Sequence, residues 1–109
     1  MFSSPAGEVK ALLSAQASAT TGSVATAPAF GKAIEATVRH NTTGAVSATI
    51  EIYGNTRNDN TDGILLATIT LSGTTVARDG FAFDAPWPFI YAKLNAISAT
   101  STVDVDLAV

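Results

Sequence analysis

The sequence predicts one small all-β domain, a β-sandwich or jelly roll of about seven to eight short strands. Three observations favour this fold class. Several segments alternate between apolar and polar residues, turn-forming Gly, Asn, Asp and Ser separate these segments, and no long stretch follows the period of a helix. With 109 residues, the chain is long enough to bury one hydrophobic core but not two.

The N-terminal part of the chain has the weakest pattern. Residues 1–10 follow no clear period and contain Pro and Gly, so we interpret them as an N-terminal arm and residues 11–109 as the sandwich domain. Residues 9–17 fit one face of a helix as well as the alternation of a strand, and both interpretations stay open. A short strand is expected over residues 24–27, with a turn at Pro28.

The clearest strand pattern lies in the middle of the chain. Residues 33–39 and 46–53 each place apolar side chains at alternate positions, with polar or charged residues between them. The connecting residues 41–44 read Asn-Thr-Thr-Gly, a composition typical of tight turns. We therefore predict that these two strands form a β-hairpin.

The second half of the chain supplies the remaining strands. In chain order we expect a polar loop over residues 54–63, a strand over 64–71, a turn over 72–74, short strands on both sides of 78–80, and strands over 89–97 and 102–109. Phe81 and Phe83 are expected to share one face. The last strand alternates most regularly, and its inward residues are predicted to be Val103, Val105, Leu107 and Val109.

The composition is unusual for a protein that stays alone in water. Charged residues make up 14% of the chain, against roughly 25% in ordinary soluble domains, and the mean hydropathy is +0.29. A compact, Thr-rich β surface could stay soluble with few charges. We favour the other interpretation, in which much of the surface is covered by a partner or by further copies of the chain.

Several classes of function lack the residues that they need. The net charge is −3 and the six Lys and Arg residues are scattered, which argues against nucleic acid as a partner. The absence of Cys excludes disulfides, thiolate metal sites and a Cys nucleophile. No apolar stretch approaches the roughly 20 residues that span a membrane. Residues 11–17 resemble a signal peptide but have no basic head, so we expect a complete chain made in the cytoplasm.

Three groups of polar residues have features of chemical sites. Residues 58–63 place oxygen-bearing side chains at alternate positions before a Gly, as calcium loops do, but position twelve is Ile69 where a Glu is needed. His40 is the single histidine, and no Gly-x-Ser-x-Gly turn presents a nucleophile for it. Asp104 and Asp106 are two residues apart on one predicted strand face, the ordinary spacing of solvated carboxylates. We therefore predict no enzyme activity, no cofactor and no metal.

The stretch from Ala85 to Tyr91 carries the most information. Its two prolines hold Trp87 on a stiff, extended segment, and the strand that follows is apolar on both faces. One face is expected to line the core, while the other needs cover from the chain or from a partner. Trp87 could close the core, contact another protein, or serve as a platform for a sugar ring.

Four stretches of the chain resemble small tailed-phage particle proteins, and most of all the jelly-roll proteins that decorate, or cement, phage capsids. They are GNTRNDNTDG at 54–63, ILLATITLSGT at 64–74, DAPWPFIYAKL at 84–94 and AISATSTVDV at 96–105. The likeness covers residues 33–109 and lies in the general character of the sequence, since this family has no catalytic signature to match. It implies a homo-oligomer on the outer surface of the virion, made in the host cytoplasm and bridging neighbouring major capsid protein subunits.

The sequence thus favours a structural virion protein, with a candidate protein interface that consists of Phe2, Trp87, Phe89 and Tyr91. Two alternatives remain. One is a carbohydrate- or receptor-binding β-sandwich module in which Trp87 is the platform. The other is a different structural component of the phage tail or head-tail junction.

Overall fold

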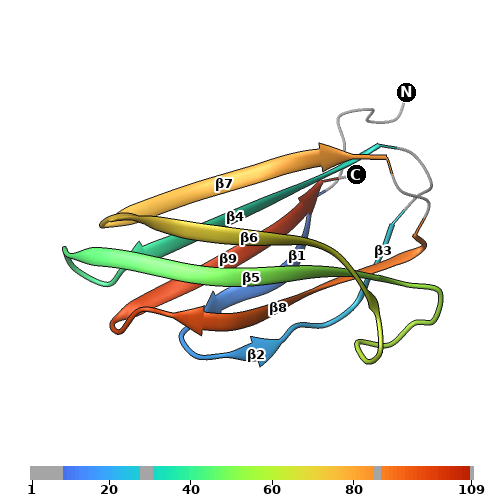
Figure 1. Ribbon diagram of the computed structural model, residues 1–109, viewed down its shortest axis with the longest axis horizontal. Coiled ribbons are helices and arrows are strands. Elements are labelled where there is room, and N and C mark those ends of the chain that lie inside the picture. Colours follow the sequence, from blue (N-terminus) through green and yellow to red (C-terminus); the bar gives the residue numbers. More distant parts are fainter. Residues whose placement is uncertain (1–8, 28–30, 85–86, 109) are drawn as a thin grey trace, which may run out of the picture.

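Nine strands account for most of the chain in the computed structural model, which describes residues 9–27, 31–84 and 87–108 (Figure 1). The strands are β1 (Val9–Gln16), β2 (Thr20–Thr21), β3 (Ala25–Thr26), β4 (Lys32–His40), β5 (Ala45–Asn55), β6 (Ile64–Thr74), β7 (Val76–Phe83), β8 (Phe89–Ile97) and β9 (Ser101–Ala108). The described residues contain no helix, and hence none that could cross a membrane. The all-β prediction is confirmed.

The strands form two antiparallel sheets that pack face to face. One sheet has the order β1-β9-β4-β7 and the other the order β6-β5-β8, with β2 and β3 paired to the far side of β8. The only ladder pair between the sheets in the described part of the chain is Thr74 with Val76, at the turn from β6 to β7. Most successive strands alternate between the sheets, which is the strand order of a jelly roll.

β2 and β3 are two pieces of one edge strand. Both pair antiparallel with β8, and between and beyond them Gly22 N donates to Ala92 O and Ala27 N to Pro88 O, each at 2.8 Å. Counted in this way, the sandwich has four strands in each sheet. The predicted number of about seven to eight strands therefore agrees with the fold.

The predicted hairpin between residues 33–39 and 46–53 is wrong. Both strands exist, but β4 pairs with β7 and β9, whereas β5 pairs with β6 and β8 in the other sheet. The connection Asn41–Gly44 crosses between the sheets and is held by Thr75, whose backbone bonds to His40 N and Gly44 O. Two amphipathic strands can meet side by side or across a core, and alternation alone does not distinguish these arrangements.

The segment that fitted both helix and strand is a strand with two irregularities. The register of β1 against β9 shifts between Ala11 and Leu13, and again before Gln16. Leu12 and Leu13 are consequently both buried, although they are neighbours in the sequence. Such bulges break the two-residue period that identifies a strand, which explains the ambiguous pattern. β1 begins at Val9, so the last two residues of the predicted arm belong to the sheet.

Two turns expected in the second half of the chain are also wrong. β6 continues through residues 72–74, and the chain reverses at Thr75, which has a φ of 68°. β7 runs unbroken through Arg78, Asp79 and Gly80. Gly80 is required there because a Cβ would lie 2.4 Å from the carbonyl oxygen of Ile34 on the neighbouring strand. Its role is a close approach of two backbones, not a turn.

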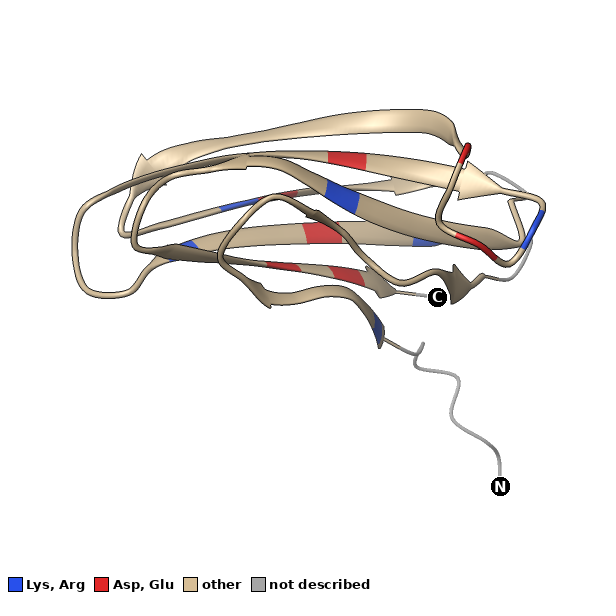
Figure 2. Cartoon of the chain, turned by 90° about the horizontal axis from the view of Figure 1, so that it is seen from below, with Lys and Arg blue, Asp and Glu red and all other residues tan. Residues whose placement is uncertain are grey.

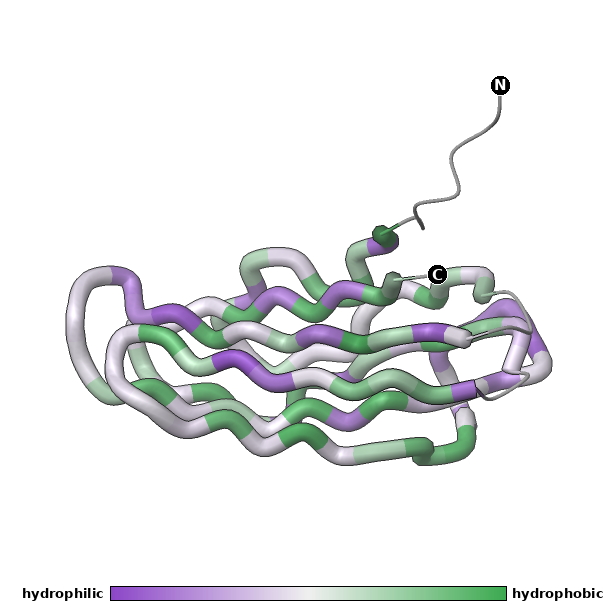
Figure 3. Tube along the Cα trace, turned by 90° about the horizontal axis from the view of Figure 1, so that it is seen from above, coloured by the Kyte–Doolittle hydropathy of each residue, from purple (hydrophilic) through white to green (hydrophobic). Residues whose placement is uncertain are grey.

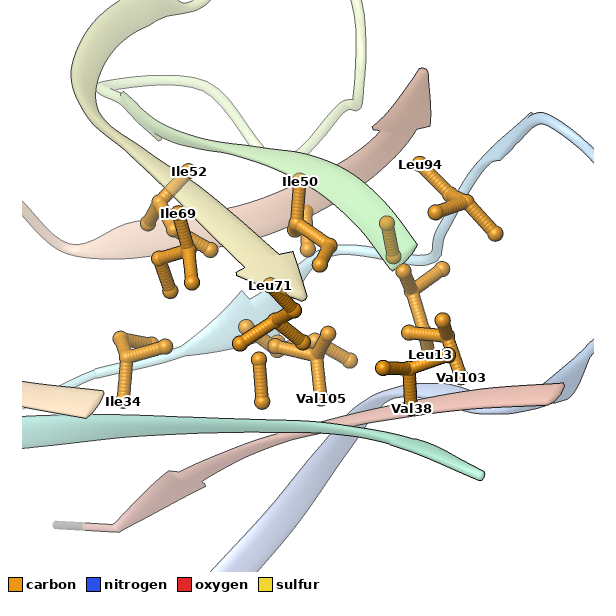
Figure 4. Packing of buried hydrophobic residues seen from close by; sticks show 14 of the residues in the cluster. Leu13, Ile34, Val38, Ile50, Ile52, Ile69, Leu71, Leu94, Val103 and Val105 are labelled. Carbon is orange, nitrogen blue, oxygen red and sulfur yellow. The ribbon is translucent and has the colours of Figure 1, made fainter. Parts of the chain in front are cut away.

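The core lies between the two sheets and consists mainly of aliphatic side chains (Figure 4). Ile34 and Val38 of β4 face Ile50 and Ile52 of β5 across it, and all four are almost fully buried. Val103, Val105 and Leu107 of β9 point inward as predicted. Val109, the fourth residue of that predicted row, lies outside the described residues.

Candidate protein interface

The four predicted contact residues do not form one exposed patch. Phe2 lies outside the described residues, Trp87 and Phe89 are half-buried, and Tyr91 is only 3% exposed. Tyr91 therefore has almost no exposed surface for a partner to contact. Of the six aromatic side chains that the structure describes, five are half-buried and Tyr91 is buried.

Trp87 covers one end of the core. It packs against the hydrophobic cluster, and its indole lies directly over Gly54 of β5, where a Cβ would come within 2.5 Å of the ring. Gly is needed at this position because the indole occupies the space of a side chain. Trp87 therefore acts first as part of the packing, and only its outer side is open to solvent.

Tyr91 is covered by the chain itself, on the outer face of β8. Its ring stacks on that of Tyr53, with centroids 5.0 Å apart and planes at 10°. The Tyr91 hydroxyl accepts a hydrogen bond of 3.0 Å from Gly63 N, at the end of the polar loop. The second apolar face of this strand thus needs no partner near Tyr91, because the loop and β5 supply the cover.

The polar loop between β5 and β6 is organised by Asn55, which is buried at the end of β5. Its Nδ2 donates to Asp59 O, Asp59 Oδ1 and Thr61 O at 3.0–3.1 Å, and its Oδ1 accepts from Arg57 N at 3.1 Å. Asn60 ties the loop to the edge strand through a bond of 3.0 Å to Gly22 O. These bonds hold the loop against the sheet.

The carboxylate of Asp59 is occupied by donors of the same loop. Its Oδ1 accepts from Thr61 N and from Thr61 Oγ1, both at 3.1 Å. The backbone bond from Thr61 is the main reason that the pKa of Asp59 is lowered. Within the described ranges, no group of three or more His, Cys, Asp or Glu side chains could hold a metal ion.

A polar pocket of about 270 Å³ lies beside the stacked tyrosines. Its lining residues are Thr21, Tyr53, Asn60, Asp62, Gly63, Tyr91 and Lys93. Tyr53 donates a hydrogen bond of 2.6 Å to Glu51, which raises the pKa of Tyr53 to about 12. The same bond, followed by one from Asn95, lowers the pKa of Glu51. This pocket was not predicted, because loop and strand meet there only in the folded chain.

The other titratable candidates have structural contacts. His40 Nδ1 is 3.0 Å from Thr42 N, and its Nε2 is 3.0 Å from Thr100 Oγ1, so both ring nitrogens contact turn residues. Asp104 Oδ1 accepts a bond of 2.9 Å from Ala15 N in the bulged strand β1. Asp106 lies opposite Glu35, and its pKa is raised by burial and then by the charges of Asp104 and Glu35.

The most exposed apolar surface is aliphatic and follows β6. The exposed large hydrophobic side chains are Val9, Ile64, Leu65 and Val76, and three of these four lie on β6 or directly after its terminal turn. Ile64 is 55% exposed and Leu65 49%. β6 has no charged residue and no Pro, and Figure 2 accordingly shows no coloured band on it.

β6 is also a free edge of its sheet. On one side it pairs with β5 along its length, and on the other side the described residues provide only the single pair of Thr74 with Val76. An unpaired edge exposes backbone N–H and C=O groups that another strand can bind. The sequence held a signal for this site, an uncharged run over residues 64–74, but the pattern does not show which strand lies at an edge.

Comparison with protein-family models, curated proteins and solved structures finds no match for this chain. The described residues form a well-packed sandwich in which none of the described aromatic side chains is fully exposed, and the uncharged edge strand β6 is open.

Proposed function

We propose that this protein is a structural component of a virion, a capsid decoration protein that binds the outer surface of a phage head. It would be made in the host cytoplasm, and would stabilise the contacts between major capsid protein subunits as a homo-oligomer. The observation that carries the proposal is the uncharged, open edge of β6 with exposed Ile64 and Leu65, in a chain with only 14% charged residues. The sequence resemblance to jelly-roll decoration proteins suggests the particle to which such a homo-oligomer would bind.

Such a role suits a small domain with modest contact areas. Each copy would contribute a weak contact, and repetition over a symmetric shell would turn many weak contacts into a large effect on particle stability. Phe89 and the outer side of Trp87 stay available as contact candidates beside the β6 surface, since both are half-buried.

The experiment is a binding assay with assembled heads. Under this proposal the genome that encodes the chain also encodes a major capsid protein. That protein should be assembled into heads, mixed with the purified chain, and separated by sedimentation. We expect the chain to sediment with the heads at a fixed stoichiometry and to raise their temperature of disruption. A chain that stays in the supernatant at every concentration tested would refute the decoration role.

The same assay addresses the alternative locations on the particle. A tail or head-tail component would bind isolated tails or portal complexes and leave closed heads unlabelled. Electron microscopy of gold-labelled chain bound to whole particles separates these outcomes.

A carbohydrate- or receptor-binding module remains the second candidate, supported by the polar pocket beside Tyr53 and Tyr91. Aromatic rings next to polar side chains are a common setting for sugar recognition. If Trp87 is the platform, Trp87→Ala should abolish glycan binding. If the sugar binds in the polar pocket, Lys93→Ala should abolish it. A glycan array without any hit for the unaltered chain would exclude this candidate.

A further inference from the structure

We propose that two copies of this chain pair through their β6 edges, antiparallel and about a two-fold axis beside Thr70, so that the β6 sheet continues from one copy into the other. The proposal deepens the homo-oligomer of the proposed function by naming its surface. It is tested on the isolated chain, so it can fail while head binding stands.

The first argument is that β6 lacks two of the usual protections of an edge strand, charged side chains and Pro, and that its one irregularity lies near its start. Natural edges are blocked by charged side chains, by Pro, or by bulges. One edge strand of the other sheet, β7, follows this rule, because Arg78 and Asp79 are exposed on it. β6 has no charge and no Pro over its eleven residues.

The backbone geometry of β6 leaves a regular segment for pairing. Its one register shift against β5 lies at Leu66, near its start. From Ala67 to Ser72 every residue has a direct partner on β5, so this segment continues an ordinary antiparallel ladder. The free backbone groups on its other side can therefore bind a further strand in the same way.

The side chains of β6 make this edge complementary to itself. In an antiparallel pair across a two-fold axis, residue i of one copy lies opposite residue j of the other, and j opposite i. An axis at Thr70 places Thr70 opposite Thr70 and Ile69 opposite Leu71, and it brings the Ile64 end of one copy to the Val76 end of the other. Both ends carry exposed aliphatic side chains, with Val76 at 40% exposure. Each copy would thus cover the other's apolar end.

Charge favours a second copy over an unrelated partner. Like charges directly opposite each other would oppose the pairing of two identical strands, and residues 64–74 contain none. The outward positions Thr68 and Thr70 are exposed Thr residues, which pair well across antiparallel strands. Figure 3 shows how apolar and polar colours alternate along the strands of the sandwich.

The test uses a charge at the proposed axis. Thr70→Lys would place two ammonium groups opposite each other, while Ser14→Lys adds the same charge on the exposed surface of β1 in the other sheet. We expect the unaltered chain and Ser14→Lys to form dimers in sedimentation equilibrium, and Thr70→Lys to raise the dissociation constant at least about tenfold. Circular dichroism should show that both variants fold.

The absence of Cys allows a second, independent measurement. Residues directly opposite in an antiparallel pair have Cα atoms within disulfide range. Under mild oxidation Thr70→Cys should form covalent dimers rapidly, and Ser14→Cys should do so only slowly. This measurement reports the pairing even where a lysine variant folds poorly.

Three outcomes would overturn the proposal. One is a chain that stays monomeric up to about 1 mM, which corresponds to about −4 kcal/mol of binding free energy. Another is a dimer that Ser14→Lys weakens and Thr70→Lys does not. The third is a monomeric chain whose head binding is lost in Thr70→Lys, since this would show that β6 pairs with the capsid protein instead.

Discussion

Gly54 and Trp87 form a close contact that a single added methyl group would disturb. Because a Cβ at position 54 would lie 2.5 Å from Trp87 Cγ, Gly54→Ala must displace the indole or bend β5. We expect a loss of about 1–3 kcal/mol in the free energy of unfolding, the usual cost of overpacking. Urea denaturation followed by Trp fluorescence measures both the loss and the displacement.

Gly31→Ala is the matched control for that substitution. A Cβ at Gly31 would meet nothing within 4 Å, so its stability should stay close to that of the unaltered chain. Equal stability of Gly54→Ala and the unaltered chain would show that Trp87 does not pack on β5.

Asp106 is a residue whose charge opposes folding at neutral pH. Its pKa is raised in the folded chain by burial, by Asp104 and by Glu35, so the folded state holds the proton more strongly than the unfolded state. The cost of the charge is therefore absent below the unfolded pKa and complete above the raised folded pKa. Asp106→Asn should stabilise the chain at pH 7 by about 0.2–1 kcal/mol.

The pH dependence separates this electrostatic effect from a packing effect. The gain from Asp106→Asn should vanish below about pH 3, where the carboxyl is protonated in both states. Thermal unfolding of the unaltered chain and of Asp106→Asn at pH 7 and at about pH 3 measures this gain in stability. A gain that is the same at both values would assign it to packing.

Among the connecting elements, the loop between β5 and β6 depends on one side chain. Asn55→Ala removes three bonds that its Nδ2 donates and one that its Oδ1 accepts. We expect a loss of about 1–3 kcal/mol and faster hydrogen exchange throughout the loop. Asn58→Ala is the control, since Asn58 is exposed and none of the hydrogen bonds described involves its side chain. Loss of protection in both variants would show that Asn55 does not organise the loop.

The strands themselves were largely predictable, and their irregularities were not. The inward row of β9 follows from alternation, which depends only on neighbouring residues. The bulges of β1 disrupt the alternation that identifies a strand. The Gly at position 80 suggested a turn, although it is needed for the close approach of two strands. In each case the deciding contact is made with a residue on another strand, such as Ile34 for Gly80.

The sandwich as a unit is closed by its last strand. β9 lies between β1 and β4, so the first and the last strand of the chain are direct neighbours. Leu107 is fully buried there, and Leu107→Ala should cost about 2–5 kcal/mol. The exposed neighbour Ala108 offers the control Ala108→Ser, which should stay within about 0.5 kcal/mol. Chemical denaturation measures the free energy of unfolding of both variants. A small loss of stability in Leu107→Ala would contradict the packing of β9.

Across the whole domain, folding decides which apolar side chains remain exposed. The scarcity of charge indicated covered surface, and aromatic residues were the natural candidates for contact. Folding uses those aromatics elsewhere: Tyr91 stacks on Tyr53, and Trp87 closes the core over Gly54. The exposed side chains on β6 are aliphatic instead.

The sequence by itself therefore determined the all-β class, most strand positions and which side chains of a strand point inward, because a two-residue period is a local property. Only the tertiary structure decided which strands are neighbours, which apolar side chains the chain covers, and that β6 has an open side. Strand pairing joins residues far apart in the chain, and its choice depends on how both sheets pack around one core.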